Sequence, residues 1–166
     1  MTLLDAPQFD TARDLRRRRI IFATVGVLGT LTLAFWMMSG MPLDWPWTWN
    51  SHRLGGIAVD RFLRDVERND QAGAYAVWVH DRDWQQHPGK YPWYTFERFQ
   101  MDWAPGAAEN DYGTIKTHTF KAARMYGNVL VVGILINGKR KDALFLDYDT
   151  KTRQLGFSPV ELYLGP

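Results

Sequence analysis

The residues best suited to chemistry gather in one short polar stretch, where His80-Asp81-Arg82-Asp83 is followed by His87. Imidazole and carboxylate groups are ligands for zinc or manganese. Arg82 interrupts this group, however, and the spacing matches none of the patterns of closed metal sites. The sequence therefore favours a solvated loop, and we predict neither a bound metal nor a cofactor.

A second set of candidates is an acid–base group inside a cavity, made by Asp102, Tyr112 and His118. A cavity shifts the pKa of such a group by removing it from water, which is how a protein tunes an acid or a base. Most residues of this kind are surface or structural groups, and the chain has no nucleophile elbow, glycine-rich phosphate loop or cysteine. We therefore predict that the chain is not an enzyme, with a cavity isomerase or dehydratase as the alternative.

Five arginines, Arg13 and Arg16 to Arg19, form a local basic cluster. Such a cluster can bind nucleic acid, but the formal net charge of the whole chain is only +2, which argues against that partner. The cluster stands directly before an apolar segment, and positively charged flanks of membrane helices stay in the cytoplasm. We therefore expect residues 1–19 to form a cytoplasmic basic arm, and we expect no nucleic-acid partner.

Residues 20–41, IIFATVGVLGTLTLAFWMMSGM, carry no charged side chain. About 20 apolar residues cross the ~30 Å hydrocarbon layer as a helix. A cleavable signal peptide is the rival interpretation, but its apolar region is shorter, ~7–15 residues, and ends in small residues. We predict one retained transmembrane helix. Its basic N-terminal flank places the N-terminus in the cytoplasm of a bacterial inner membrane and the rest of the chain in the periplasm.

Two features of this anchor indicate contacts with lipid headgroups or with another membrane protein. Small residues at roughly helical spacing would let a neighbouring helix approach closely. Residues 42–56 form a linker rich in Trp and Pro, which the prolines keep non-helical and whose alternating tryptophans are typical of a membrane–water interface. The residues predicted to contact membrane or partner are Arg16, Arg17, Arg18, Arg19, Ala23, Gly26, Gly29, Thr30, Trp36, Trp45, Trp47 and Trp49.

Residues 57–166 show the pattern of an extracytoplasmic α+β domain. The spacing of apolar residues predicts helices over 57–68, 71–79 and 95–103. From residue 112 the pattern changes to strands, over 114–125, 129–136, 143–148 and 154–163, with Asn137-Gly138 as a tight hairpin turn. About three helices followed by about four antiparallel strands predict helices packed on one face of a curved sheet.

The segments FLRDVERNDQAGAYAVW at 62–78 and FERFQMDW at 96–103, followed by a hairpin-rich sheet, resemble the nuclear-transport-factor-two-like group. That group belongs to the cystatin-like α+β folds, so the resemblance, over roughly residues 57–163, implies a cone-shaped domain. Its members include isomerases, dehydratases, transport factors and non-catalytic accessory domains. Because one fold hosts all of these functions, the resemblance does not show which of them this chain has.

The sequence as a whole favours a non-catalytic accessory subunit of a larger integral-membrane complex, with a photosynthetic or respiratory assembly as the expected host. The small-residue face of the anchor, the stiff Trp-rich linker and the lack of a chemistry-bearing motif support this interpretation. The alternative is a membrane-tethered module that holds a small apolar molecule in the cavity of the cone. The two are distinguished by whether the chain migrates with a large complex or alone.

Overall fold

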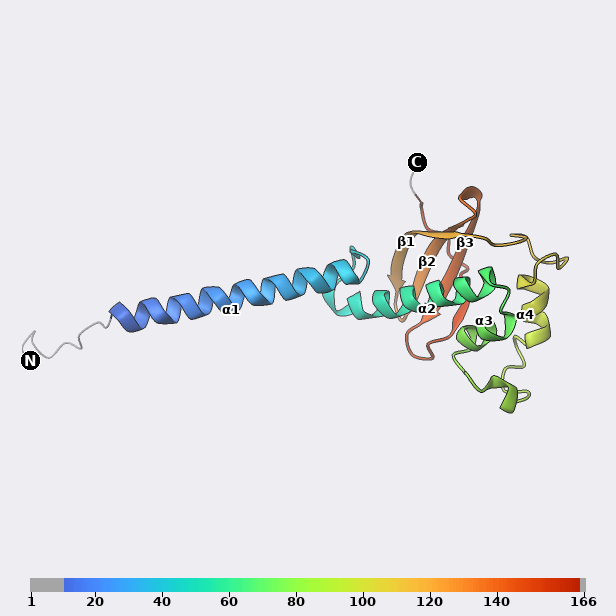
Figure 1. Ribbon diagram of the computed structural model, residues 1–166, viewed down its shortest axis with the longest axis horizontal. Helices are drawn as coiled ribbons and strands as arrows, with labels where there is room; N and C mark the ends of the chain where they lie inside the picture. The colour runs from blue at the N-terminus through green and yellow to red at the C-terminus, as the bar shows by residue number, and fades with distance from the viewer. Residues whose placement is uncertain (1–10, 165–166) are drawn as a thin grey trace, which may run out of the picture. The chain divides into compact units, whose positions relative to one another are not determined.

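The computed structural model describes residues 11–164, except for the side chains of residues 140–142. The chain divides after Met38 into two units, and each is described here by itself. The first unit is helix α1, Thr11–Met38, which buries none of its residues (Figure 1). It is the one helix in the described part of the chain that is long and apolar enough to cross a membrane, judged by length and composition.

The bounds of α1 differ from those predicted for the anchor. The helix begins at Thr11, well before Ile20, and it ends at Met38 instead of Met41. The part of the basic arm that the structure describes is therefore helical. Arginine is a good helix former, and an ion pair one turn apart, from Arg18 Nε to Asp14 Oδ2 at 3.0 Å, supports the added turns.

The second unit is an α+β domain built on a four-strand antiparallel sheet with strand order β1-β2-β3-β4. Each strand pairs with its neighbours in sequence, so the sheet is a simple meander (Figure 1). Its strands are β1 His118–Tyr126, β2 Val129–Ile136, β3 Lys139–Asp149 and β4 Leu155–Phe157, and its helices are α2 Trp49–Glu67, α3 Gln71–Trp78 and α4 Phe96–Trp103. The predicted fold class, helices and an antiparallel sheet after one apolar helix, is confirmed at this level.

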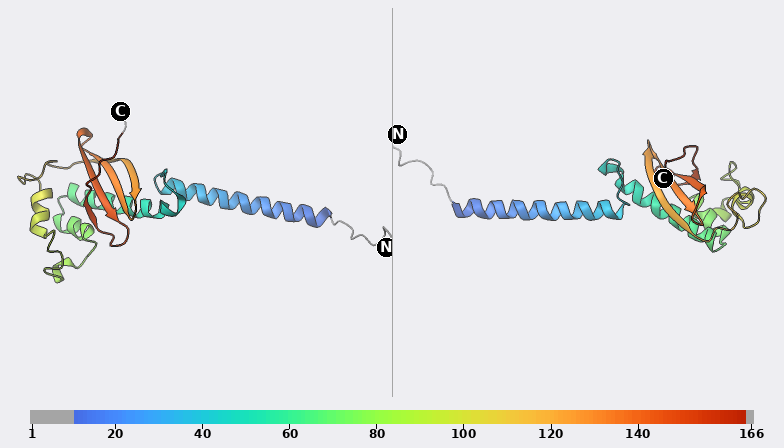
Figure 2. Two further views of the ribbon diagram at one scale, coloured as in Figure 1. Left: turned by 180° about the vertical axis from the view of Figure 1, so that it is seen from behind. Right: turned by 90° about the horizontal axis from the view of Figure 1, so that it is seen from above.

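Helix α2 lies along one face of the sheet (Figure 2). Phe62 and Leu63 on its inner side are fully buried. Gly55 allows the close approach, because a Cβ atom there would lie 2.6 Å from Leu130 Cδ2 and 3.0 Å from the Tyr148 ring. A larger residue would force the helix away from the sheet at this point.

Strand β2 is the centre of the sheet, and residues 130–136 are buried on both faces. The face that packs against the helices carries Leu130, Val132 and Ile134, which belong to the main core. On the other face, an added Cβ at Gly133 would meet Leu164 Cδ2 at 2.6 Å, so the end of the described chain packs there. This double cover explains why the sequence of β2 is almost wholly apolar.

Several element bounds in the domain were predicted wrongly, among them the start of β3, which lies at Lys139 and not at residue 143. The linker was expected to be non-helical up to residue 56, yet a 3₁₀ turn at Pro46–Thr48 runs directly into α2, since proline is well suited to the first turn of a helix. Strand β1 begins at His118 and not at residue 114, because the preceding amides bond to the side chain of Asn137. Strand β4 ends at Phe157, where Ser158 makes a local turn through its hydroxyl.

Candidate functional site

A partly buried hydrogen-bonded group fixes the segment that joins the anchor to the domain, residues 39–48. Asp44 Oδ2 accepts a hydrogen bond from His52 Nε2 of α2 at 2.8 Å and another from the backbone N–H of Met125 in β1 at 3.1 Å. The carbonyl of Asp44 also accepts a bond from the indole Nε1 of Trp49 at 3.0 Å. We call this group the Asp44 latch. It ties residues 39–48 to both a helix and an edge strand of the domain.

Several large apolar side chains on either side of Asp44 are exposed. Met41, Leu43, Trp45 and Trp47 are all exposed, and the two tryptophans remain 69% and 74% accessible. Their rings stack in parallel, with centroids 5.0 Å apart and an interplanar angle of 5°. We call these four residues the interfacial surface. Four large apolar residues exposed at alternate positions of one short segment are the kind of feature that marks contact with lipid or protein.

The other predicted contact residues divide into two groups. Trp49 does not belong to the interfacial surface, because it is half-buried and its indole N–H is bonded within the latch. Arg16 to Arg19, Ala23, Gly26, Gly29, Thr30 and Trp36 all lie on α1. The Thr30 hydroxyl donates to the Gly26 carbonyl at 3.0 Å, and added Cβ atoms at Gly26 or Gly29 would meet nothing within 4 Å. This face of α1 is satisfied in its hydrogen bonds and sterically open.

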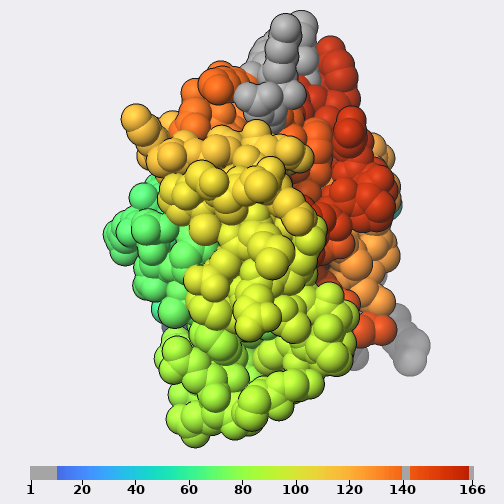
Figure 3. Space-filling model, turned by 90° about the vertical axis from the view of Figure 1, so that its right-hand side faces the viewer, coloured from blue at the N-terminus to red at the C-terminus, as the bar shows by residue number. Residues whose placement is uncertain are grey.

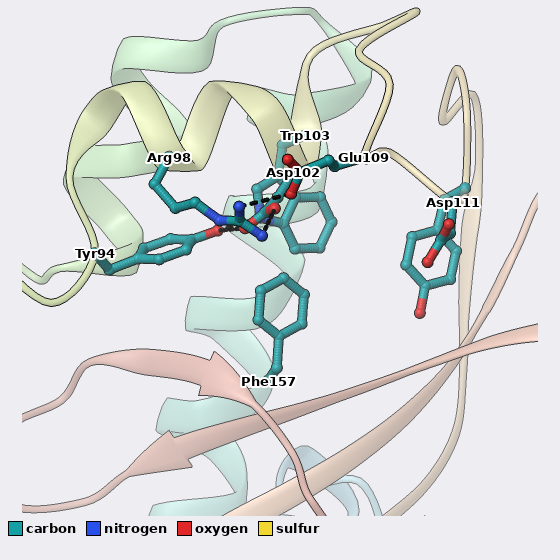
Figure 4. Close-up of a pocket in the computed structure, with 8 residues that line it drawn as sticks. Tyr94, Arg98, Asp102, Trp103, Glu109, Asp111 and Phe157 are labelled. Atoms are coloured by element: carbon teal, nitrogen blue, oxygen red, sulfur yellow. Dashed lines mark hydrogen bonds and ion pairs between the residues drawn. The ribbon is translucent and has the colours of Figure 1, made fainter.

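A cavity of about 600 Å³ lies between α4, the loop that follows it, and β4. Figure 3 views the domain from this end, with α4 and its loop in yellow-green to yellow and the last strands in red. The side chains around the cavity are aromatic or charged (Figure 4), and they include Tyr94, Arg98, Asp102, Asp111, Tyr112 and Phe157.

A closed network forms one wall of the cavity. The Tyr94 hydroxyl donates to Asp102 Oδ2 at 2.7 Å and accepts from the indole Nε1 of Trp103 at 3.2 Å. Arg98 pairs with Asp102 Oδ1 at 3.0 Å and with Glu109 at 2.6 Å. Burial, with the bond to the Asp102 carboxylate, raises the pKa of Tyr94 far above its ordinary value, so this phenol is a permanent donor. Both oxygens of Asp102 are therefore engaged in holding the wall together.

The structure brings together two of the three residues proposed as an acid–base group. Asp102 and Tyr112 line the cavity, whereas His118 in β1 lies against α2, with Nδ1 2.7 Å from Glu67 and Nε2 3.2 Å from Asp60. His118 therefore joins a strand to a helix. The sequence reasoning missed Tyr94, Arg98 and Phe157. The spacing of Arg98 and Asp102, four residues apart on a helix, was the one local signal for that pair.

The polar stretch from His80 to His87, considered above as a metal site, is held together by one carboxylate, that of Asp81. Asp81 Oδ2 lies 2.8 Å from Lys90 Nζ, accepts a 2.8 Å bond from the Tyr91 hydroxyl, and lies 2.9 Å from His87 Nδ1. The bond from Lys90, followed by that from Tyr91, lowers the pKa of Asp81 well below its usual range. A lysine ammonium group thus takes the position at Asp81 where a cation would bind. Among residues 11–164, apart from the side chains of residues 140–142, the structure places no group of three His, Asp or Glu to hold a metal.

Comparison with known protein families, with curated proteins and with solved structures finds no match to this chain. The class that the structure itself defines is an α+β domain that follows one long apolar helix. The likeness to the cystatin-like folds stays a prediction from the sequence.

Proposed function

We propose that the chain is a non-catalytic accessory subunit of a larger integral-membrane complex, of the photosynthetic or respiratory kind. In this proposal α1 crosses a bacterial inner membrane, with the basic N-terminal flank in the cytoplasm and the α+β domain in the periplasm. The length and apolar composition of α1 support its role as an anchor. The open small-residue face at Gly26 and Gly29 supports contact with another helix.

The observation that carries the proposal is the Asp44 latch with the interfacial surface beside it. Asp44 turns inward to His52 and Met125, and this holds the stacked Trp45 and Trp47 rings outward. Tryptophan combines an apolar body with one polar N–H, which suits it to the boundary between headgroups and hydrocarbon. A subunit that works by contact would use such a surface, beginning three residues after the end of α1, to seat its domain against lipid headgroups and its host.

The test is the migration of the chain after mild detergent extraction of its native membranes. We expect it to migrate with a complex much larger than itself. The double variant Trp45→Ser/Trp47→Ser should lower its yield in that complex while the domain stays folded. Trp93→Ser is the matched control, because Trp93 is 70% exposed but lies in the loop before α4. Migration as a monomer, or equal losses from both variants, would contradict the proposal.

The cavity supports a second candidate, a membrane-tethered module that holds a small molecule. Its volume of about 600 Å³ lies within the ~300–1,000 Å³ range of ligand pockets. This candidate predicts a chain that migrates alone and carries a bound molecule. Asp102, which the sequence offered as an acid or base for an isomerase or dehydratase, is bonded to Tyr94 and Arg98 and is therefore not free for that role.

A further inference from the structure

The cavity beside α4 carries an excess of negative charge. Asp102, Glu109 and Asp111 contribute carboxylates, and Arg98 contributes the one guanidinium among the lining residues. Arg98 is committed to Asp102 and Glu109, so its charge is already balanced on that wall. Asp111 is exposed and forms no ion pair or hydrogen bond with any residue that the structure describes. A charged group that enters the cavity would therefore meet an uncompensated carboxylate.

Aromatic rings form the rest of the cavity. Phe157 is 46% exposed, and its ring stacks on the buried Trp103 with centroids 5.5 Å apart and an interplanar angle of 3°. Tyr112 lies nearly parallel to Trp103 at 6.4 Å. Figure 4 shows Phe157 and Asp111 on different sides of the open space. The negative faces of such rings attract a cation within ~6 Å of their centroids, most strongly when the cation is weakly hydrated.

We propose that this cavity binds a small organic cation that carries a methylated ammonium group. Asp111 supplies the opposite charge, Phe157 and Tyr112 supply the aromatic faces, and the Arg98 bridge forms a rigid wall. An anion would be repelled by the excess carboxylates. A neutral apolar molecule would gain nothing from Asp111 and would partly desolvate it at a cost. The cavity thus selects by charge as well as through its aromatic faces.

This site does not depend on the subunit role. A chain that fails to join a complex can still bind the cation, and a chain that joins one need not lose the site. Binding is therefore measured on the purified full-length chain in detergent, and complex formation is measured in membranes, so the two proposals fail separately.

The probes are choline and its uncharged isostere 3,3-dimethylbutan-1-ol, titrated against the full chain in non-ionic micelles. The readout is the NMR signal of the Trp103 indole N–H, which donates to Tyr94 beside the cavity. We expect choline to shift this signal saturably and the alcohol to bind about tenfold more weakly, since the alcohol lacks the cation–π and charge terms. Equal shifts from both probes, or no shift from choline up to roughly 10 mM, overturn the proposal.

Two variants and one control locate the binding energy. Asp111→Asn removes only the unpaired charge and should weaken choline about two- to fivefold, as expected for an exposed ion pair. Phe157→Leu should weaken it roughly threefold, with an otherwise unchanged NMR spectrum to show that the fold is kept. Glu97→Gln, on α4 but outside the lining, should leave the affinity unchanged. Loss of affinity in the control equal to that of Asp111→Asn would indicate a diffuse charge effect and overturn the site.

Discussion

Replacing Asp44 by alanine should destabilise the domain far more than its position on a partly exposed segment suggests. The carboxylate accepts one hydrogen bond from His52, whose side chain is 3% exposed, and one from the Met125 amide. Alanine leaves both donors without their acceptor. A hydrogen bond to a charged group contributes about 1.5–3 kcal/mol, and an unsatisfied buried donor costs about 1–3 kcal/mol. Because Asp44 keeps some contact with water, we expect a loss of about 2–4 kcal/mol in the free energy of unfolding.

The assay is urea unfolding of the full chain in non-ionic micelles, followed by tryptophan fluorescence, because most of the tryptophans lie in the domain. Asp111→Ala is the control, since this exposed aspartate has no bond to lose, and we expect a change within about 0.5 kcal/mol. Asp44→Asn should fall between the two, because the amide oxygen can keep one of the bonds. If Asp44→Ala unfolds at the same urea concentration as the control, the latch does not stabilise the domain and our reasoning is wrong.

Further outcomes are expected from the same structure. Val132→Asp should leave the domain unfolded by circular dichroism. Val132 is 2% exposed in strand β2, and an unpaired carboxylate buried at that position costs several kcal/mol. Gly56→Ala should stabilise α2 by about 1 kcal/mol in urea unfolding, since nothing lies within 4 Å of the added methyl group. Gly55→Ala should instead destabilise by about 1–2 kcal/mol, because its methyl group meets the core at 2.6 Å; equal effects at the two glycines would contradict this packing. Because its pKa is lower in the folded than in the unfolded chain, Asp81 stabilises the fold at neutral pH, and this contribution fades as the pH falls below the ordinary value of 3.8. Lys90→Met should raise the pKa of Asp81 toward its ordinary value in an NMR titration of its carboxyl carbon, and it should make the loss of stability at low pH smaller.

The sequence predicts those elements whose signals are local. The apolar run of β2 and the Asn137-Gly138 turn were both identified, and the turn has the positive φ angles, 52° and 70°, that these residue types allow. Helix α4 lies within the predicted range 95–103, and it begins after Thr95, whose hydroxyl accepts from the Arg98 amide at 3.3 Å. In each case the determining interaction spans only a few residues.

Trp45, Trp47, Asp102 and Tyr112 were named from the sequence, but the other members of the candidate sites were missed because their contacts are distant in the sequence. Asp44 and Met125 meet across 81 positions, and His118 and Glu67 across 51. The cavity joins Tyr94 and Asp102 to Phe157, a residue that the strand pattern alone presents as one more apolar position. The spacing of apolar residues within one strand does not show which helix packs against which face of that strand. Of the predicted trio, Asp102 and Tyr112 therefore share the cavity, whereas His118 lies elsewhere, between β1 and α2.

Because of the Asp44 latch, residues 39–48 do not form a flexible tether between anchor and domain in the proposed subunit. A flexible tether would leave a domain free to tumble beside the membrane, whereas Trp45 and Trp47 belong to the same folded unit as the sheet. They are held through the 3₁₀ turn, α2 and the bond to Met125, so their position is set by the core. If these two rings bind the membrane–water interface, their fixed position in the domain determines which face of the domain is turned toward the membrane. A subunit that acts by contact needs this, since its binding surface must meet the host in one orientation.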